Sequence, residues 1–308
     1  MSKVKNYLSL IKFSHTIFAM PFALIGFFLG MGKGLSSTQS SLNSTIGWGN
    51  DITNFIWVKN VLIRFALVIL SMIFARSAAM AFNRFLDRKF DAKNPRTAIR
   101  EIPAGIITEK NALAFTIVNC GLFVLCTYFI NSICFYLSPV ALFVILFYSY
   151  TKRFTALCHL VLGLGLSLAP IGAYLAVTGK FDWLPLLFSF AVLFWVSGFD
   201  IIYALQDEEF DRANQLHSIP SMLGKTKALR VSELLHVLSA GCVIFAGLYG
   251  KFGYWYWAGI AVFTGMLIYQ HSIVKPNDLR KVNIAFMTAN GIASVVFAIF
   301  VLLDLFLS

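Results

Sequence analysis

Nine apolar stretches, each long enough to cross a lipid bilayer, run through this sequence and constrain its fold more than any other feature. A bilayer core takes roughly 20 helical residues per crossing. Backbone groups in hydrocarbon must form hydrogen bonds within their own segment, and the stretches lack the alternating pattern of barrel strands. We therefore predict an all-α polytopic membrane protein, a bundle of nine transmembrane helices. The expected spans are 14–32, 60–82, 112–130, 133–151, 156–178, 184–204, 228–249, 253–272 and 284–306.

The composition agrees with a lipid environment. Hydrophobic residues make up 58% of the chain and charged residues only 13%, which is more apolar surface than a soluble domain can bury. No segment outside the nine stretches is long enough to form a second large domain. We expect residues 1–308 to form one membrane-embedded domain in contact with membrane lipid.

The formal charge of +11 is distributed by topology. With nine spans, most basic residues fall in segments on one side of the membrane, namely 3–12, 84–110, 152–153, 212–230 and 275–281. The positive-inside rule makes that side cytoplasmic. This sorting argues against a nucleic-acid partner, which would require one basic soluble face. The long charged loops also place the expected chemistry at the cytoplasmic side of an integral membrane protein, which we assign to a bacterial inner membrane.

Two groups of polar residues with four-residue spacing occur at predicted helix ends. The first group is Asn83, Asp87 and Asp91, and the second is Asp200, Tyr203, Asp207 and Asp211. Residues four apart lie on one face of a helix, so each group forms one stripe of oxygen atoms. Carboxylates at membrane helix ends are costly unless they are paired or bound to metal, and two facing stripes would repel each other.

Magnesium would resolve this repulsion. Mg²⁺ prefers oxygen ligands and binds through one or two carboxylates together with substrate phosphates. The competing interpretation is that these acids form ordinary ion pairs with neighbouring basic residues, namely Arg84, Arg88, Lys89 and Arg212. Two stripes with the same spacing on the same side favour metal binding over ion pairing.

Several cations near the stripes are suited to a diphosphate group, namely Arg84, Arg88, Lys93, Arg96, Arg100 and Lys225. The positive-inside rule accounts for some of them. Arg96 and Arg100 stand apart because the segment 94–105 contains turn-forming residues that could fold it over the site. Arg76 lies two turns before Asn83 on the same helix face, and an intramembrane cation is a functional candidate.

Three of these motifs together resemble a known family. The motif 83–91 followed by 96–105 resembles the first signature of the UbiA-type intramembrane prenyltransferases, and 207–211 followed by 216–224 resembles the second. The element 148–152, Tyr-x3-Lys, is also similar to one in that family. The similarity is greatest to the 4-hydroxybenzoate polyprenyltransferase branch.

The resemblance implies nine helices around a central cavity, with two Mg²⁺ ions holding a diphosphate. The implied metal ligands are Asn83, Asp87, Asp91, Asp207 and Asp211, and the four aspartates are the expected catalytic residues. It also implies that Tyr148 and Lys152 contact the diphosphate and that Arg153 holds the acceptor carboxylate, a role for which Arg76 is the other candidate. With the cations named above, the expected substrate-binding residues are Asn83, Arg96, Arg100, Tyr148, Lys152, Arg153, Arg76 and Tyr203.

The implied activity is transfer of a polyprenyl group from polyprenyl diphosphate to the ring of an aromatic acid in ubiquinone or menaquinone biosynthesis. The sequence departs from the 4-hydroxybenzoate pattern at 100–103 and at Arg84. The acceptor therefore stays open between a 4-hydroxybenzoate-like acid and a dihydroxynaphthoic acid. A transporter with a cation site is the alternative from a different class, but it would carry its ionisable residues nearer the membrane midplane.

Overall fold

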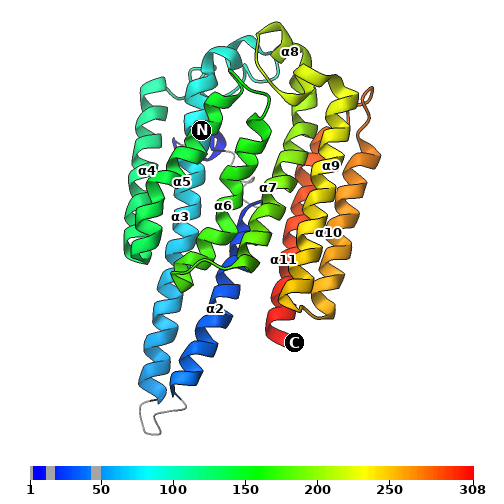
Figure 1. Cartoon of the computed structure of the whole chain (residues 1–308). Coiled ribbons are helices and arrows are strands. Elements are labelled where there is room, and N and C mark those ends of the chain that lie inside the picture. The colour runs from blue at the N-terminus through cyan, green and yellow to red at the C-terminus, as the bar shows by residue number, and fades with distance from the viewer. Residues whose placement is uncertain (1–2, 12–17, 43–49) are drawn as a thin grey trace.

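The computed structural model, which describes residues 3–11, 18–42 and 50–308, is a bundle of long helices (Figure 1). Within these residues no strand is present beyond one isolated bridge, Lys275 with Asp278. The helices are α1 (Lys3–Leu10), α2 (Met20–Leu42), α3 (Asn50–Lys93), α4 (Glu109–Ile130), α5 (Ser132–Thr151), α6 (Cys158–Thr178), α7 (Trp183–Ala204), α8 (Glu208–Ala213), α9 (Ile219–Gly250), α10 (Tyr254–Ile273) and α11 (Asn290–Leu307). A 3-10 turn at Leu205–Asp207 and a π-helical segment at Ile284–Ala289 precede α8 and α11. The prediction of an all-α membrane bundle is confirmed.

Seven helices of the described chain are long and apolar enough to span a membrane. The expected spans at 14–32 and 253–272 are not among the seven. The first corresponds to a shorter apolar stretch, Met20–Gly32, and its residues 14–17 lie outside the described residues. The second corresponds to α10, whose last turns carry Gln270 and His271. The structure thus supports the predicted architecture without confirming the count of nine.

Two helices extend further than the sequence predicts, because polar residues can continue a helix beyond the hydrocarbon. The apolar pattern indicated 60–82, whereas α3 continues to Lys93 and carries the first acidic stripe on its last turns. Similarly, α9 begins at Ile219, and Gly224 kinks it with a φ of 76°. In Figure 1 the segment after α3 and the helix α8 lie at the same end of the bundle. The charged segments therefore meet at one end, as predicted.

Helix α7 lies at the centre of the bundle, packed against α6 and α9. Its buried Phe188, Trp195 and Phe199 join an aromatic cluster with residues of α2, α10 and α11. Aromatic pairs of this kind add packing energy beyond their buried area. The second acidic stripe begins on the last turns of α7, so the most firmly packed helix positions it.

The interface of α6 with α7 depends on a glycine. A Cβ atom on Gly163 would lie 2.4 Å from the backbone oxygen of Leu193 and 2.4 Å from Oγ of Ser197. Because the nearest atom belongs to a helix backbone, it cannot move aside without shifting α7. Only glycine permits this approach of the two helices.

We predict that Gly163→Ala lowers the free energy of unfolding by about 1–3 kcal/mol, the usual cost of overpacking a core. Gly172→Ala in the same helix is the matched control, because a Cβ at Gly172 meets no atom within 4 Å. Thermal unfolding of both variants in the same detergent measures the difference. Equal melting temperatures would show that the α6–α7 approach is not as tight as described.

Candidate active site

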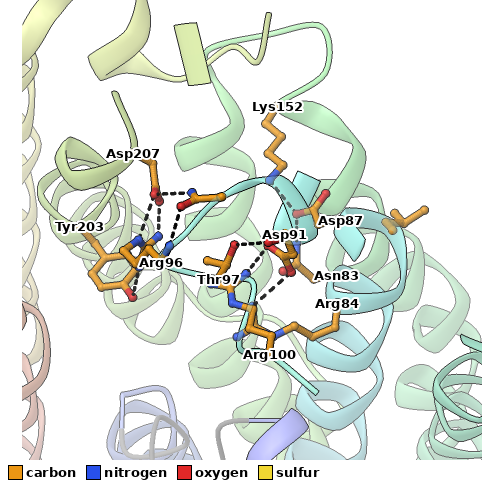
Figure 2. Close-up of polar contacts among 12 residues, drawn as sticks. Asn83, Arg84, Asp87, Asp91, Arg96, Thr97, Arg100, Lys152, Tyr203 and Asp207 are labelled. Atoms are coloured by element: carbon orange, nitrogen blue, oxygen red, sulfur yellow. Dashed lines mark hydrogen bonds and ion pairs between the residues drawn. The ribbon is translucent and has the colours of Figure 1, made fainter. Parts of the chain in front are cut away.

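The acidic stripe of α3 lies almost entirely out of solvent. Asp87 is 2% exposed and Asp91 is 6% exposed, and Asn83 Nδ2 donates a hydrogen bond to Asp87 Oδ2 at 3.2 Å. Buried carboxylates are destabilising unless cations or hydrogen-bond donors compensate them. The partners of these two aspartates therefore define the site (Figure 2).

The partners of Asp87 come from the end of α5. Lys152 Nζ lies 2.7 Å from Asp87 Oδ2, and Arg153 Nη2 lies 3.1 Å from Oδ1. The Arg153 guanidinium also donates to the backbone oxygens of Leu86 and Ser149. In this structure Arg153, the predicted acceptor-binding residue, is thus occupied by Asp87 and by backbone carbonyls.

The partners of Asp91 come from the segment that follows α3. Arg100 Nη1 lies 2.6 Å from Asp91 Oδ1, and Arg84 Nη1 lies 4.0 Å from Oδ2. Thr97 Oγ1 donates to the backbone oxygen of Asp91 and ties this segment to the helix end. Asp91 Oδ2 is buried and has no hydrogen-bond partner among the described residues. That oxygen is available to a further ligand.

The second stripe meets the same segment from the side of α7. Arg96 donates from Nε and Nη2 to the two carboxylate oxygens of Asp207, and from Nη1 to the Tyr203 hydroxyl at 3.0 Å. Asn94 Nδ2 donates to Asp207 Oδ1 at 3.1 Å. Burial opposes the charge on Arg96, but these hydrogen bonds outweigh it and raise the pKa of its guanidinium above the ordinary value.

Asp211 lies one turn further, on α8. Its backbone oxygen accepts a hydrogen bond from Leu216 N at 2.8 Å, and its side chain is hydrogen-bonded to Ser218. Lys152 is among the charged groups within electrostatic reach of this carboxylate. His217 N donates to the Lys152 backbone oxygen, which holds the loop after α8 against the end of α5.

The structure therefore brings the predicted residues together in two subclusters joined by the segment 94–100. One contains Asn83, Asp87, Asp91, Arg100, Lys152 and Arg153, and the other contains Arg96, Tyr203 and Asp207. Their assigned roles stay predictions. Sequence reasoning missed Asn94 as a partner of Asp207, although its position two residues before Arg96 permits the turn in which Arg96 N donates to Asn94 Oδ1.

The donor set is compatible with magnesium. Among the described residues, no three His, Cys, Asp or Glu side chains converge into a closed metal site. Mg²⁺ does not require one, because it binds through one or two carboxylates and takes its other ligands from water and phosphate. Arg96, Arg100 and Lys152 now occupy carboxylate positions that a metal ion and a diphosphate would share. The unpartnered Asp91 Oδ2 fits this arrangement.

An apolar cavity of about 400 Å³ is lined in part by Tyr148, which is within electrostatic reach of Asp87 and Arg84 in the charged cluster. It lies between α3, α4, α5 and α6, and Arg76 and Tyr148 are the polar side chains that link its wall to the cluster. Arg76 Nε is buried without a hydrogen-bond partner among the described residues. An unpaired cation in a membrane cavity is a candidate ligand-binding group.

The UbiA prenyltransferase family model matches residues 54–292. This chain belongs to the UbiA prenyltransferase family. The prediction of an integral membrane prenyltransferase is thereby confirmed, and the transporter alternative loses its support.

Similar proteins agree with this assignment. A 4-hydroxybenzoate octaprenyltransferase of Nitrosomonas europaea is 32% identical over 236 residues, which cover 75% of this chain and 79% of that protein. The 4-hydroxybenzoate octaprenyltransferase of Pseudomonas fluorescens is 31% identical over 224 residues, covering 72% and 74%.

Solved structures share the fold. The apo structure of a UbiA homolog from Aeropyrum pernix superposes with a TM-score of 0.74 at 25% identity, covering 95% of this chain and 97% of that one. A UbiA homolog from Archaeoglobus fulgidus, bound to GPP and Mg²⁺, gives 0.67 at 20% identity, covering 97% and 99%.

We predict that Arg96 and Asp207 are energetically coupled by roughly 1 kcal/mol or more, because both side chains are largely buried and share a two-pronged contact. A double-mutant cycle with Arg96→Met and Asp207→Asn, followed by unfolding in detergent without divalent metal, measures this coupling. Added Mg²⁺ should reduce it by competing for the carboxylate.

The exposed pair Arg280 and Asp278, whose atoms approach to 2.7 Å, is the control. Exposed ion pairs contribute little, so Arg280→Met and Asp278→Asn should be additive. A coupling between Arg96 and Asp207 no larger than that of the control pair would contradict the compact cluster.

Proposed function

We propose that this protein transfers a polyprenyl group from polyprenyl diphosphate to the ring of an aromatic acid, with Mg²⁺ as cofactor. The acceptor is a 4-hydroxybenzoate-like acid of ubiquinone biosynthesis or, as the second candidate, a dihydroxynaphthoic acid of menaquinone biosynthesis. The observation that carries the proposal is the junction of the charged cluster with the apolar cavity at Arg76 and Tyr148. Such a junction accommodates a molecule with a charged head and a long apolar tail.

The acidic residues Asn83, Asp87, Asp91, Asp207 and Asp211 would hold the metal. Bound Mg²⁺ neutralises the charge that develops on a leaving diphosphate. The UbiA homolog of Archaeoglobus fulgidus, solved with GPP and Mg²⁺, supports divalent metal use in this fold. That homolog is only 20% identical to this chain, so we assign the individual metal ligands from the residues of this chain alone.

The basic residues of the cluster would bind the diphosphate oxygens. Arg96, Arg100 and Lys152 are each within 3.0 Å of an aspartate oxygen, so a diphosphate that binds metal can exchange those contacts for its own. The Arg96 fork suits a phosphate group because its N–H groups lie in one plane. Tyr203 holds that fork from the side of α7.

The apolar cavity would hold the first units of the prenyl chain. Its lining is almost wholly apolar and includes Met72, Met80, Leu162 and Leu166. An apolar wall excludes water from the reactive carbon, and water would otherwise capture a prenyl cation before the acceptor ring could attack it.

Two arginines compete for the acceptor carboxylate. Arg153 is held by Asp87, Leu86 and Ser149, whereas Arg76 lines the cavity and its Nε has no hydrogen-bond partner in the described part of the chain. A planar guanidinium binds a carboxylate through two parallel hydrogen bonds only if its donors are free. This difference favours Arg76 as the acceptor-binding residue and assigns Arg153 to orienting Asp87.

We place the protein in a bacterial inner membrane with its site toward the cytoplasm. The bacterial relatives and the basic segments that surround the site support this orientation. Prenyl diphosphate and the aromatic acid would enter from the membrane and from the cytoplasm, respectively.

We predict that replacing Asp87, Asp91, Asp207 or Asp211 singly by Asn abolishes turnover, because each change removes a negative charge from the metal site. Prenyl transfer by purified protein in detergent, followed by mass spectrometry, measures the loss. Chelation of divalent metal should abolish wild-type activity, and added Mg²⁺ should restore it. Full activity in any two variants would refute the metal site.

We predict that Arg76→Lys raises the Michaelis constant for the aromatic acid, because an ammonium group cannot form two parallel hydrogen bonds. Arg76→Met should raise it further, by a few kcal/mol in binding free energy. The Michaelis constant for prenyl diphosphate should change little.

Arg153→Lys is the matched comparison. If Arg153 orients Asp87, Arg153→Lys should mainly lower the turnover number and should change the Michaelis constant for the aromatic acid less. If the Michaelis constant for the aromatic acid is normal in the Arg76 variants but raised in Arg153→Lys, then Arg153 is the acceptor-binding residue.

A further inference from the structure

A buried histidine and an aspartate form a pair that the proposed metal and diphosphate contacts leave unused. His159 of α6 is 3% exposed, and its Nδ1 lies 2.7 Å from Oδ2 of Asp200 on α7. Asp200 lies about two turns before Asp207, which is in the 3-10 turn that follows α7. Carboxylates inside membrane bundles are rare and commonly functional.

The hydrogen-bond network fixes the form of the histidine. The backbone N–H of Ile219, at the start of α9, donates to His159 Nε2 at 3.3 Å. A nitrogen that accepts a hydrogen bond carries no proton, so the proton of a neutral imidazole must be on Nδ1. His159 therefore donates from Nδ1–H to Oδ2 of Asp200, which leaves the carboxylate its negative charge.

Neighbouring contacts hold this pair in place. Ser197 Oγ donates to the His159 backbone oxygen at 3.1 Å, and the glycine contact of Gly163 brings α6 against α7 at the same level. The three helices that meet at His159 are thus fixed relative to one another, and with them the direction of the Asp200 side chain.

Asp200 is the more open member of the pair. Its side chain is 24% exposed, whereas Phe199, Ile201 and Ile202 beside it are 3% exposed or less. Of the described residues, none donates a hydrogen bond to its second oxygen, Oδ1. Tyr148 lies within electrostatic reach of both Asp200 and Asp87, and also of Arg76. Asp200 is therefore near Tyr148, which is itself near the proposed diphosphate position at Asp87 and the proposed acceptor position at Arg76.

We propose that Asp200 is the base that accepts the proton released by the acceptor ring, and that His159 is its positioning residue. This inference rests on the proposed function. In the reaction, the C–O bond between prenyl C1 and the diphosphate breaks, and the electron pair leaves with the diphosphate. A ring π pair then forms the new C–C bond, which leaves that ring carbon with both its hydrogen and the prenyl group.

The aromatic ring is restored when that hydrogen leaves as a proton and its bonding pair returns to the ring. Asp200 Oδ1 accepts the proton, while His159 Nδ1–H stays bonded to Oδ2. The carboxylic acid then releases the proton to water as product leaves. Atoms and electrons balance, and no oxidant or reductant is required.

The decisive experiment uses the isotope effect of the ring hydrogen. Wild type and Asp200→Asn are assayed with geranylgeranyl diphosphate, Mg²⁺, and 4-hydroxybenzoate that carries either hydrogen or deuterium on the ring carbons beside the hydroxyl. If the wild type prefers 1,4-dihydroxy-2-naphthoate, that acid with deuterium at the ring position it prenylates is used instead.

We expect Asp200→Asn to lower the turnover number by roughly 10²- to 10⁴-fold, the usual contribution of a positioned base. Its deuterium isotope effect should exceed that of the wild type, because proton loss becomes slower than ring attack. Binding of prenyl diphosphate should be unchanged. If the pair of His159 and Asp200 only held α6 against α7, the substitution would lower stability without increasing the isotope effect.

Two further variants separate positioning from packing. Asn at 159 can place its amide N–H where His159 Nδ1–H lies, so His159→Asn should keep most activity. His159→Leu removes the donor and should lower turnover by up to roughly 100-fold with an increased isotope effect, because the base loses its orientation. If Asp200→Asn does not fold, the comparison of His159→Asn with His159→Leu still tests the proposal.

Asp304→Asn is the matched control, since Asp304 is another buried aspartate, bonded to the backbone of Gly253 and Tyr256 away from the site. It should retain wild-type turnover and isotope effect. Wild-type transfer tests the proposed function on its own. An active wild type with equally active Asp200→Asn, or with equal isotope effects in both, would overturn the proton role alone.

Discussion

The organisation of the site depends on the burial of Asp87 and Asp91 at the end of α3. Two carboxylates that are 6% exposed or less cannot remain charged without nearby cations, and the chain supplies these from α5 and from the segment after α3. The end of α5 and the segment after α3 are thereby held against the end of α3. The same charges that hold the helix ends together can be exchanged for metal and diphosphate, so the electrostatic balance of the free protein prepares it for its substrate.

The proposed prenyl transfer requires both the charged cluster and the apolar cavity. In the proposed function, cations and carboxylates hold the head of a prenyl diphosphate, while α3 to α6 surround an apolar space for its tail. Arg76 and Tyr148 line the cavity, and Asp200 of α7, which is paired with His159 of α6, is within electrostatic reach of Tyr148. Binding, ionisation and proton removal can then be assigned to different side chains around one junction.

Much of this arrangement could be predicted from the sequence. Four-residue spacing placed Asn83, Asp87 and Asp91 on one face, and apolar length gave the helical bundle. Pairings between distant segments could not be predicted, because they depend on how helix ends meet. Arg153 had been assigned to the acceptor, yet it contacts Asp87 in the folded chain. His159 could not be assigned a role from the sequence, because the N–H that bonds its Nε2 comes from Ile219, 60 residues further along the chain.

In the proposed function, the charged cluster and the cavity together join a prenyl group to an aromatic ring. The most direct measurement incubates purified protein with geranylgeranyl diphosphate and a panel of aromatic acids, with and without Mg²⁺, and identifies the products by mass. The account predicts a ring-prenylated hydroxybenzoic or dihydroxynaphthoic acid that forms only with the metal. Cleavage of the diphosphate to the free prenyl alcohol, with no prenylated acid from any member of the panel, would contradict it.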